Sequence, residues 1–175
     1  MDINEKALLY RAQSGDRQAA GRLFENYFRE IYTYIFYKVR DSTTAEKISA
    51  DVFVRLLQEL PDYRNQQKPF INWLYSLARK QVDEYESIGS RGGGEQEDAV
   101  AIDPPVEVPE AVGCFRRAIQ HLEEPQQSMI IHRFVEGRSL KDAADLLGKE
   151  YRAARSLQHR ALVALEKALY KEDCL

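Results

Sequence analysis

The sequence predicts an all-α protein composed of two small helical domains. Apolar residues recur at the three- and four-residue spacing of helices, no long stretch alternates as a strand would, and a segment rich in glycine, proline and acids separates two helical stretches. With 44% hydrophobic and 30% charged residues, the 175-residue chain has the composition of a soluble globular protein. We therefore expect domains over residues 1–86 and 112–175, joined by a flexible linker over residues 87–111.

The first domain is predicted to begin with a short helix that ends at Ser14-Gly15 and a longer helix capped by Asp16. The apolar positions of the longer helix repeat at helical spacing: Ala20, Leu23, Phe24, Tyr27, Ile31 and Ile35. Tyrosines are frequent here, and we interpret them as core residues with a solvated hydroxyl in preference to base-stacking residues: Tyr27, Tyr32, Tyr34 and Tyr37.

A third helix is predicted from the capping box of Thr43 and Glu46. Its inward positions form a nearly unbroken set: Ala45, Ile48, Ser49, Val52, Phe53, Leu56, Leu57 and Leu60. Its outward positions are charged: Glu46, Lys47, Asp51, Arg55 and Glu59. These charges serve either to solubilise the domain or to dock another protein, and the sequence leaves both interpretations open.

A fourth helix is predicted to open at Pro69, after the polar loop DYRNQQK. Its inward face is apolar: Phe70, Trp73, Leu74, Leu77 and Ala78. Its other face is polar: Asn72, Ser76, Arg79 and Asp83, with Lys80 near the edge. Aromatic residues beside a polar loop are suited to hold extruded bases, which need stacking partners and hydrogen-bond donors. Trp73 itself is predicted to belong to the core.

The predicted linker concentrates negative charge. Residues 86–111 hold seven acids and one base, so the net charge of −3 for the whole chain conceals a balance of +3 elsewhere. Neither domain is strongly basic. Attraction to DNA phosphates is weak for such domains, which favours DNA binding assisted by a partner protein over independent tight binding.

The second domain is predicted to contain a helix-turn-helix. Its first two helices are indicated by an apolar series and by a proline that opens the second of them, which stops at Gly137: Val112, Phe115, Ile119, Leu122 and Pro125. In the next helix Ser139 and Asp142 form a cap, and Gly148 supplies the left-handed residue that ends it. The inner face of that helix is apolar: Leu140, Ala143, Ala144 and Leu147.

A longer helix is predicted to begin near Glu150 with two distinct faces. One face is apolar: Ala154, Ala161, Leu162, Leu165, Ala168 and Leu169. The other collects cations and donors: Arg152, Arg155, Ser156 and His159. This arrangement suits the major groove of DNA, since arginine pairs with phosphate oxygens or guanine edges. A solvated basic face on an ordinary bundle helix produces the same pattern, so both interpretations stay open here.

Other classes of function lack the sequence patterns they require. No phosphate-binding GxxxxGK[ST] loop, nucleophile elbow or metal-spaced His or Cys group occurs, so we expect neither catalysis nor a cofactor. His121 and His132 are interpreted as surface or half-buried imidazoles, and Cys114 and Cys174 as reduced thiols. The absence of a signal-peptide pattern and of a membrane-length apolar segment predicts a cytoplasmic protein without membrane insertion.

These blocks together resemble the extracytoplasmic-function (ECF) group of bacterial RNA polymerase sigma factors. AEKISADVFVRLLQEL followed by PFINWLYSLARKQVDEY is similar to region 2 of that family. LEEPQQSMIIHRFVEGRSLKDAADLLG with RSLQHRALVALEKAL is similar to region 4. The order of the blocks, their spacing and the acidic linker make the resemblance more specific than either block alone. It implies a region 2-like helical bundle and a region 4-like helix-turn-helix.

The resemblance also implies roles for the polar surfaces. Region 2 would contact the polymerase clamp and the melted minus-ten element, and region 4 the minus-thirty-five element. The implied polymerase-binding residues are Glu46, Lys47, Asp51 and Arg55. The implied minus-ten residues are Tyr63, Arg64, Asn65, Asn72, Arg79, Lys80 and Asp83, and the implied upstream residues are Arg152, Arg155, Ser156, His159 and Arg160. The implied partners are core RNA polymerase, promoter DNA and an anti-sigma factor. The acidic linker would occupy a basic nucleic-acid channel until RNA displaces it.

Some positions depart from the family pattern. Ala50 replaces a usual glutamine, Lys80 replaces a usual asparagine, and Lys149, Ala154 and Gln158 stand where apolar residues are usual. Gln158 is predicted to lie on the inward stripe, where an amide without a partner costs about 1–3 kcal/mol. Two alternatives stay open: a sigma-like interaction protein that binds polymerase or a regulator without directing initiation, and an independent helix-turn-helix repressor, which the weak basic balance disfavours.

Overall fold

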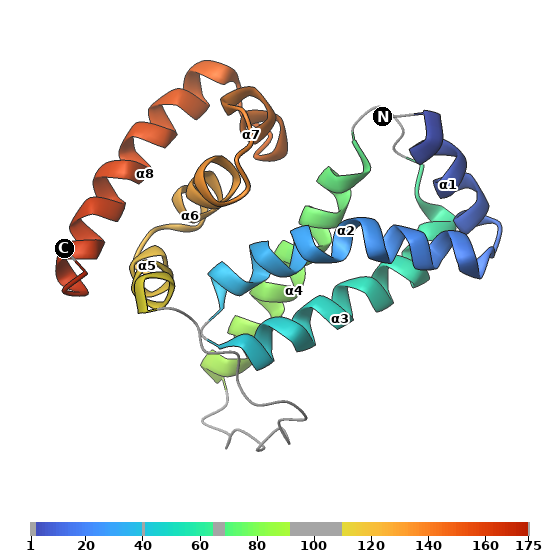
Figure 1. Cartoon of the computed structure of the whole chain (residues 1–175), viewed down its shortest axis with the longest axis horizontal. Coiled ribbons are helices and arrows are strands. Elements are labelled where there is room, and N and C mark those ends of the chain that lie inside the picture. Colours follow the sequence, from blue (N-terminus) through green and yellow to red (C-terminus); the bar gives the residue numbers. More distant parts are fainter. Residues whose placement is uncertain (1–2, 40, 65–68, 92–109, 175) are drawn as a thin grey trace. The chain divides into compact units, whose positions relative to one another are not determined.

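The computed structural model describes residues 3–39, 41–64, 69–91 and 110–174. Within these residues it contains helices and no strand, as the sequence predicts (Figure 1). The chain divides into two compact units. Of the described residues, the first unit comprises 3–35, 43–64 and 69–91, and the second comprises 36–39, 41–42 and 110–174.

The described part of the first unit consists of long helices and one short 3-10 turn. Their bounds are α1 Ile3–Gln13, α2 Arg17–Lys38, α3 Ser42–Glu59, η1 Leu60–Asp62 and α4 Phe70–Arg91. Gly15 has a φ of +89° between α1 and α2. The Oδ1 atom of Asp16 accepts hydrogen bonds from the backbone N–H groups of Gln18 at 2.9 Å and Ala19 at 3.1 Å. The predicted stop and the predicted cap are therefore confirmed.

Aromatic rings connect α2 to its neighbours in the first unit. Phe24 of α2 meets Phe53 of α3 edge-on, with ring centroids 4.8 Å apart. Tyr34 of α2 meets Tyr75 of α4 edge-on at 5.1 Å, and both of these tyrosines are buried. Such edge-to-face pairs add to the stabilisation from burial. Tyr34 is therefore a core residue, as predicted, but at 0% exposure its hydroxyl is not solvated, contrary to the prediction.

Two predictions about the third helix are wrong. The helix begins at Ser42, so Thr43 lies inside its first turn and does not cap it. Leu57 is 54% exposed, although it was predicted to face inward. Consecutive helical residues point about 100° apart, so Leu56, at 1% exposure, occupies the core position and turns Leu57 outward.

The helices on either side of the predicted linker are longer than the sequence suggested. α4 continues to Arg91, and α5 begins at Glu110. Residues 87–91 and 110–111, which were predicted as parts of the linker, are thus helical. The proposed occupation of a polymerase channel falls mainly on residues 92–109, which lie outside the described residues.

The second unit is a small cluster of helices that includes one π-helical turn. Its bounds are α5 Glu110–Ile119, α6 Glu124–Ile130, the π-helical turn η2 Ile131–Val135, α7 Leu140–Leu146 and α8 Tyr151–Lys171. Pro125 lies in the first turn of α6, and Gly137 ends the α6–η2 stretch with a φ of +68°, as predicted. The π-helical turn was not predicted.

His132 is buried, which corrects the prediction of a surface or half-buried imidazole. Its side chain is 1% exposed, and its Nδ1 lies 2.9 Å from Oε2 of Glu136. Arg138 donates to the same oxygen at 2.8 Å, and burial lowers the pKa of Arg138. The sequence does carry a signal for this pair, because Glu136 follows His132 by four positions and helical residues so spaced share a face.

The prediction of two reduced thiols is also wrong. Cys114 of α5 and Cys174, beyond the end of α8, form a disulfide whose Cα atoms are 5.9 Å apart. The cysteines are separated by 60 positions, and the tertiary fold brings them together. Local spacing therefore contains no signal for the pairing.

Candidate nucleic-acid interface

The helix-turn-helix of the second unit has the local geometry that its sequence predicts. Ser139 precedes α7, and its Oγ accepts a hydrogen bond from the backbone N–H of Asp142 at 3.1 Å. Gly148 has a φ of +60° in the turn, where a side chain would be strained. Glu150 is the N-cap residue of α8, one position before the helix begins. These short-range contacts fix both ends of the turn.

The described structure separates two faces of α8. The predicted DNA-binding side chains lie together on the exposed side: Arg152, Arg155, Ser156, His159 and Arg160. The opposite side is buried: Ala154, Leu157, Ala161, Leu165 and Ala168. Leu162 was predicted to face inward but is 39% exposed, whereas Leu157, which was not predicted to face inward, is 4% exposed and belongs to the core. The helix therefore packs through one face and offers cations and donors on the other.

The cations on the exposed face of α8 are available to a ligand. Within the described residues, the guanidinium groups of Arg152, Arg155 and Arg160 make no ion pair. Ser156 donates from Oγ to the carbonyl oxygen of Arg152 at 3.3 Å, which keeps its hydroxyl close to the helix. Arginine side chains of this kind can pair with phosphate oxygens or guanine edges without first breaking an internal salt bridge.

The side-chain amide of Gln158 has a hydrogen-bond partner, so the predicted cost of an inward amide without one does not arise. The residue is half-buried, and its Oε1 accepts a hydrogen bond from Nε of Arg133 at 2.9 Å. Arg133 also donates from Nη1 to the carbonyl oxygen of Arg138. The polar side chain of Gln158 in α8 is thus matched by a donor from η2, and this hydrogen bond connects the two segments.

The predicted polar face of α4 is open in the first unit. Lys80 and Asp83 are exposed, and Asn72 and Arg79 are half-buried. The inward face packs as expected at four positions, which are 0–1% exposed: Phe70, Leu74, Leu77 and Ala78. Trp73 was predicted to belong to the core, but it is only half-buried, at the edge between the two faces.

Tyr63, in the loop that precedes α4, packs against aromatic rings. It is 8% exposed, and its ring centroid lies 4.6 Å from that of Trp73 and 5.3 Å from that of Phe70. Its hydroxyl has no hydrogen-bond partner among the described residues. Burial, followed by the nearby charge of Glu5, raises the pKa of Tyr63. The Tyr63 carbonyl oxygen accepts from Nε2 of Gln13 at 2.8 Å, which holds the start of the loop.

The other predicted residues of this loop are less enclosed. Arg64 is exposed, and its Nη1 donates to the carbonyl oxygen of Pro61 at 2.6 Å. Asn65 lies outside the described residues. The structure therefore places Arg64 at the surface beside a packed Tyr63.

The predicted polymerase-binding residues lie on the outer side of α3. Glu46, Lys47 and Asp51 are exposed. Arg55 forms a 2.8 Å ion pair with Glu84 of α4, and the two side chains are 38% and 52% exposed. An exposed pair of this kind contributes little to stability, so it can be exchanged for a partner at small cost.

Sequence reasoning missed an apolar stripe beside these charges. Val54 is 52% exposed and Leu57 is 54% exposed, and Ala50 is exposed one turn before them. These positions are spaced at i, i+4 and i+7 and so share one helix face. This spacing could have predicted the stripe from the sequence. It was missed because the longer apolar series predicted for the inward face of the same helix included Leu57.

The described residues contain no group of three His, Cys, Asp or Glu side chains that could hold a metal ion. None of the described helices combines the length and apolar character that a membrane crossing requires.

Comparisons with known proteins match both units to one family. Residues 23–85 match the family model for Sigma-70 region 2, and residues 113–165 match the model for Sigma-70, region 4. The chain is 33% identical over 170 residues to the ECF RNA polymerase sigma factor BldN of Streptomyces coelicolor, covering 93% of this chain and 64% of that protein. It is 26% identical to the ECF RNA polymerase sigma factor SigD of Mycobacterium tuberculosis, covering 91% of this chain and 81% of that protein.

A solved structure shares the fold. The sigma factor RpoE in complex with the anti-sigma factor NepR from Bartonella quintana is 20% identical, with a TM-score of 0.62, over 86% of this chain and 96% of that chain. The two family models follow one another along the chain in the order that the sequence blocks predict. The chain belongs to the Sigma-70 family of RNA polymerase sigma factors, in its ECF group.

Proposed function

We propose that the chain binds core RNA polymerase and directs transcription initiation at specific promoters. The observation that carries the proposal is the exposed basic face of α8, presented by a capped helix-turn-helix whose opposite face is buried. Family membership supports it, because ECF sigma factors direct transcription initiation by binding core RNA polymerase and promoter DNA. We assign the region 2 role to residues 1–86 and the region 4 role to residues 112–175, and we propose no catalytic activity.

In this proposal α8 reads the minus-thirty-five element. Arg152 and Arg155 are exposed and lie near its N-terminal end, where a helix enters the major groove. Ser156, His159 and Arg160 continue the same exposed face. Residues 112–175 carry 11 bases and 9 acids, and this small positive excess gives too little phosphate attraction for tight independent binding, so the polymerase must contribute to affinity.

The polar face of α4 and the loop before it would hold the melted minus-ten strand. Arg64 and Lys80 supply exposed cations, and Asn72 supplies an amide able to donate and accept. Trp73 is half-buried at the edge of this face, where its ring can support a base that leaves the duplex. Tyr63 would act by packing beneath Trp73, since its own ring is covered.

The outer side of α3 would contact the polymerase. It combines three exposed charges, Glu46, Lys47 and Asp51, with the exposed apolar side chains of Val54 and Leu57. Such a mixture of apolar and charged groups is typical of a docking surface that is covered only part of the time. Arg55 joins the surface by exchanging its weak pair with Glu84.

We also propose that an anti-sigma factor covers these surfaces in the inactive state. RpoE, which shares the fold, was solved with the anti-sigma factor NepR. The exposed apolar stripe of α3 gives such a partner a surface to bury.

The proposal is tested by run-off transcription with purified core polymerase on a library of upstream and minus-ten sequences. Specific starts that require both the chain and a defined pair of elements are the expected result. Substituting Glu46 and Asp51 together by lysine should abolish starts and co-purification with core enzyme, whereas substituting the exposed Glu166 of α8 by lysine should leave co-purification intact.

The alternative function is that of a sigma-like protein that binds polymerase without directing initiation. Stable binding to core enzyme with no start on any promoter of the library would establish this alternative. Permanganate footprinting of the minus-ten region tests melting separately, because duplex binding without reactive thymines would exclude strand capture by the first unit.

A further inference from the structure

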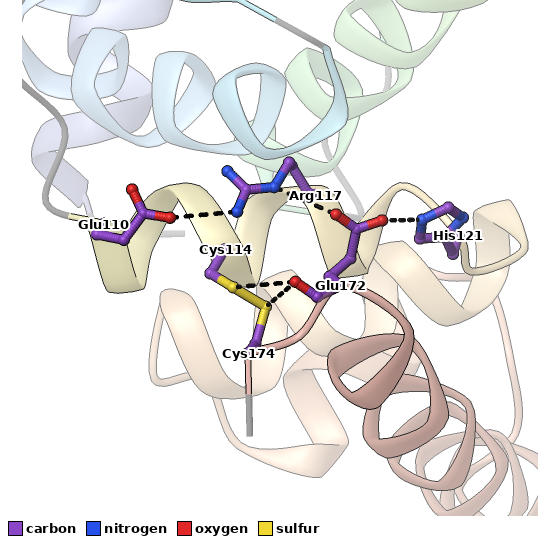
Figure 2. Close-up of polar contacts among 6 residues, drawn as sticks. All are labelled: Glu110, Cys114, Arg117, His121, Glu172 and Cys174. Atoms are coloured by element: carbon purple, nitrogen blue, oxygen red, sulfur yellow. Dashed lines mark hydrogen bonds and ion pairs between the residues drawn. A yellow bond between two sulfur atoms is a disulfide. The ribbon is translucent and has the colours of Figure 1, made fainter.

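A disulfide joins α5 to the chain that follows α8 (Figure 2). Its two cysteines, Cys114 and Cys174, are 60 positions apart. The loop that the bond closes contains α6, η2, α7 and α8, and so the entire helix-turn-helix. The bond therefore constrains every element that presents the predicted DNA-binding face.

A tight turn directs Cys174 toward α5. The helix α8 ends at Lys171, and Asp173 adopts a left-handed φ of +57°, which aspartate tolerates better than most residues. The backbone N–H of Cys174 then donates to the carbonyl oxygen of Leu169 at 2.9 Å. This bond folds the end of the chain back over the last turn of α8.

In addition to the disulfide, polar contacts of Glu172 join the same part of the chain to α5 and to the turn after it (Figure 2). Oε1 of Glu172 lies 2.6 Å from Nε2 of His121, and Oε2 of Glu172 lies 3.2 Å from Nε of Arg117. Arg117 also lies 3.3 Å from Glu110, within α5. Because these contacts involve no sulfur, they can also form in the reduced chain, where they favour proximity of the two cysteines.

Both cysteines are half-buried, so neither is fully enclosed in the core of the second unit. The carbonyl oxygen of Glu172 lies 4.0 Å from Sγ of Cys114 and 3.7 Å from Sγ of Cys174. It can accept a weak S–H hydrogen bond from either thiol once the bond is broken. The site thus accommodates the dithiol as well as the disulfide.

We propose that Cys114 and Cys174 are a reversible redox pair that sets the stability of the second unit. In reduction, a thiolate of a dithiol reductant attacks one sulfur, and the other cysteine leaves as a thiol after protonation. The second thiol of the reductant then resolves the mixed disulfide, which leaves two protein thiols and an oxidised reductant. In oxidation, hydrogen peroxide converts one thiol to a sulfenic acid with release of water, and the other thiol displaces a second water to form the disulfide.

The biological direction of the switch rests on the proposed function. A protein that works on RNA polymerase is in a compartment where reductants keep most thiols reduced, so the disulfide would accumulate under oxidative conditions. The chemical proposal does not depend on this step, and its test below uses no polymerase and no DNA.

The test compares the full-length chain after peroxide and after an excess of dithiothreitol. Labelling with a maleimide in denaturant, followed by intact mass measurement, should add no label to the oxidised chain and two labels to the reduced chain. Unfolding followed by circular dichroism should show the transition of the second unit lowered by roughly 10 °C or more on reduction. The first unit contains no cysteine, so its unfolding temperature should be the same in both states.

Three results would overturn the proposal: two labels on the peroxide-treated chain, equal unfolding transitions in both states, or a native bond that dithiothreitol leaves intact. The double variant Cys114→Ser/Cys174→Ser should unfold like the reduced chain in either buffer. Because the main comparison uses the wild-type chain, it does not depend on the folding of that variant. Glu172→Ala should slow re-oxidation several-fold, and an unchanged rate would overturn the role given to the ion pairs.

Discussion

Asp16 determines the start of α2 by accepting two backbone N–H groups, those of Gln18 and Ala19. It also pairs with Arg11 at 2.6 Å. The hydrogen bond from Ala19, followed by that from Arg11, lowers the pKa of Asp16 below 3.8. At this scale, single side chains decide where helices begin and which groups their exposed faces offer to a ligand.

Replacing Asp16 by alanine should lower the unfolding temperature of the first unit at pH 7, because the acceptor for these N–H groups is lost. A lowered pKa contributes stability that is present above the ordinary value of 3.8 and is lost as pH falls through the lower value. The difference from wild type should therefore shrink on acidification to about pH 2. Asp16→Asn keeps an acceptor and is the control, and a difference that grows at low pH would contradict the cap.

Arg155→Ala should weaken use of the upstream element by about 1–3 kcal/mol and reduce discrimination among sequences there, if the side chain contacts a base. The measurement is run-off transcription across the upstream library. Lys167→Ala is the matched control, since Lys167 is exposed on the same helix but lies twelve residues, about 18 Å, beyond Arg155. A uniform loss on all promoters would instead assign Arg155 to a phosphate contact.

At the scale of elements, α8 is positioned by its buried face and by one polar tie. Leu157, Ala161 and Leu165 face the rest of the second unit, and Gln158 at the edge of that face binds Arg133 of η2. The tie matters because Arg133 is half-buried, and a half-buried guanidinium without an acceptor is unfavourable. The polar residue at position 158 is thus compatible with a well-packed recognition helix.

Gln158→Leu should lower the unfolding free energy of the second unit by about 1–3 kcal/mol, because Nε of Arg133 loses its acceptor. Gln158→Glu keeps an oxygen at that position and should retain most of the stability. Chemical denaturation of both variants gives the comparison. Increased stability in Gln158→Leu would show that the apolar residue usual in the family packs better here and that the tie is dispensable.

At the scale of the whole molecule, two units of nearly balanced charge share the predicted task of promoter recognition. The second unit carries a covalent link that the first lacks within the described residues. Closing a loop of 60 positions is worth about 4 kcal/mol in the chain-entropy description, a large share of the stability of a small unit. The oxidation state of one bond can therefore change the fraction of chains with a folded helix-turn-helix.

Run-off transcription should depend on redox state at a temperature between the unfolding transitions of the two forms. The oxidised chain should then use promoters that require the upstream element several-fold better than the reduced chain, because more of its second unit is folded. The Cys114→Ser/Cys174→Ser variant should show no such dependence. Equal activity of both wild-type forms at that temperature would show that the oxidation state of the two cysteines does not affect promoter use.

The features that the sequence predicted correctly depend on short-range interactions. The cap at Asp16, the cap at Ser139 and the turn at Gly148 each involve residues within about four positions. The two faces of α8 follow from helical spacing, which is why its basic cluster could be predicted residue by residue. Order and spacing of the two helical blocks were enough to indicate the family.

What the tertiary structure alone decided involves partners that are far apart in the chain or lie at the edge of a helix face. Leu57 and Leu162 lie next to stronger core positions, and only packing determines which neighbour turns outward. The acceptor of Arg133 is 25 positions away, and Cys114 and Cys174 are separated by 60. Helical periodicity reports the local face of each residue, whereas contacts of this kind exist only after the helices have packed.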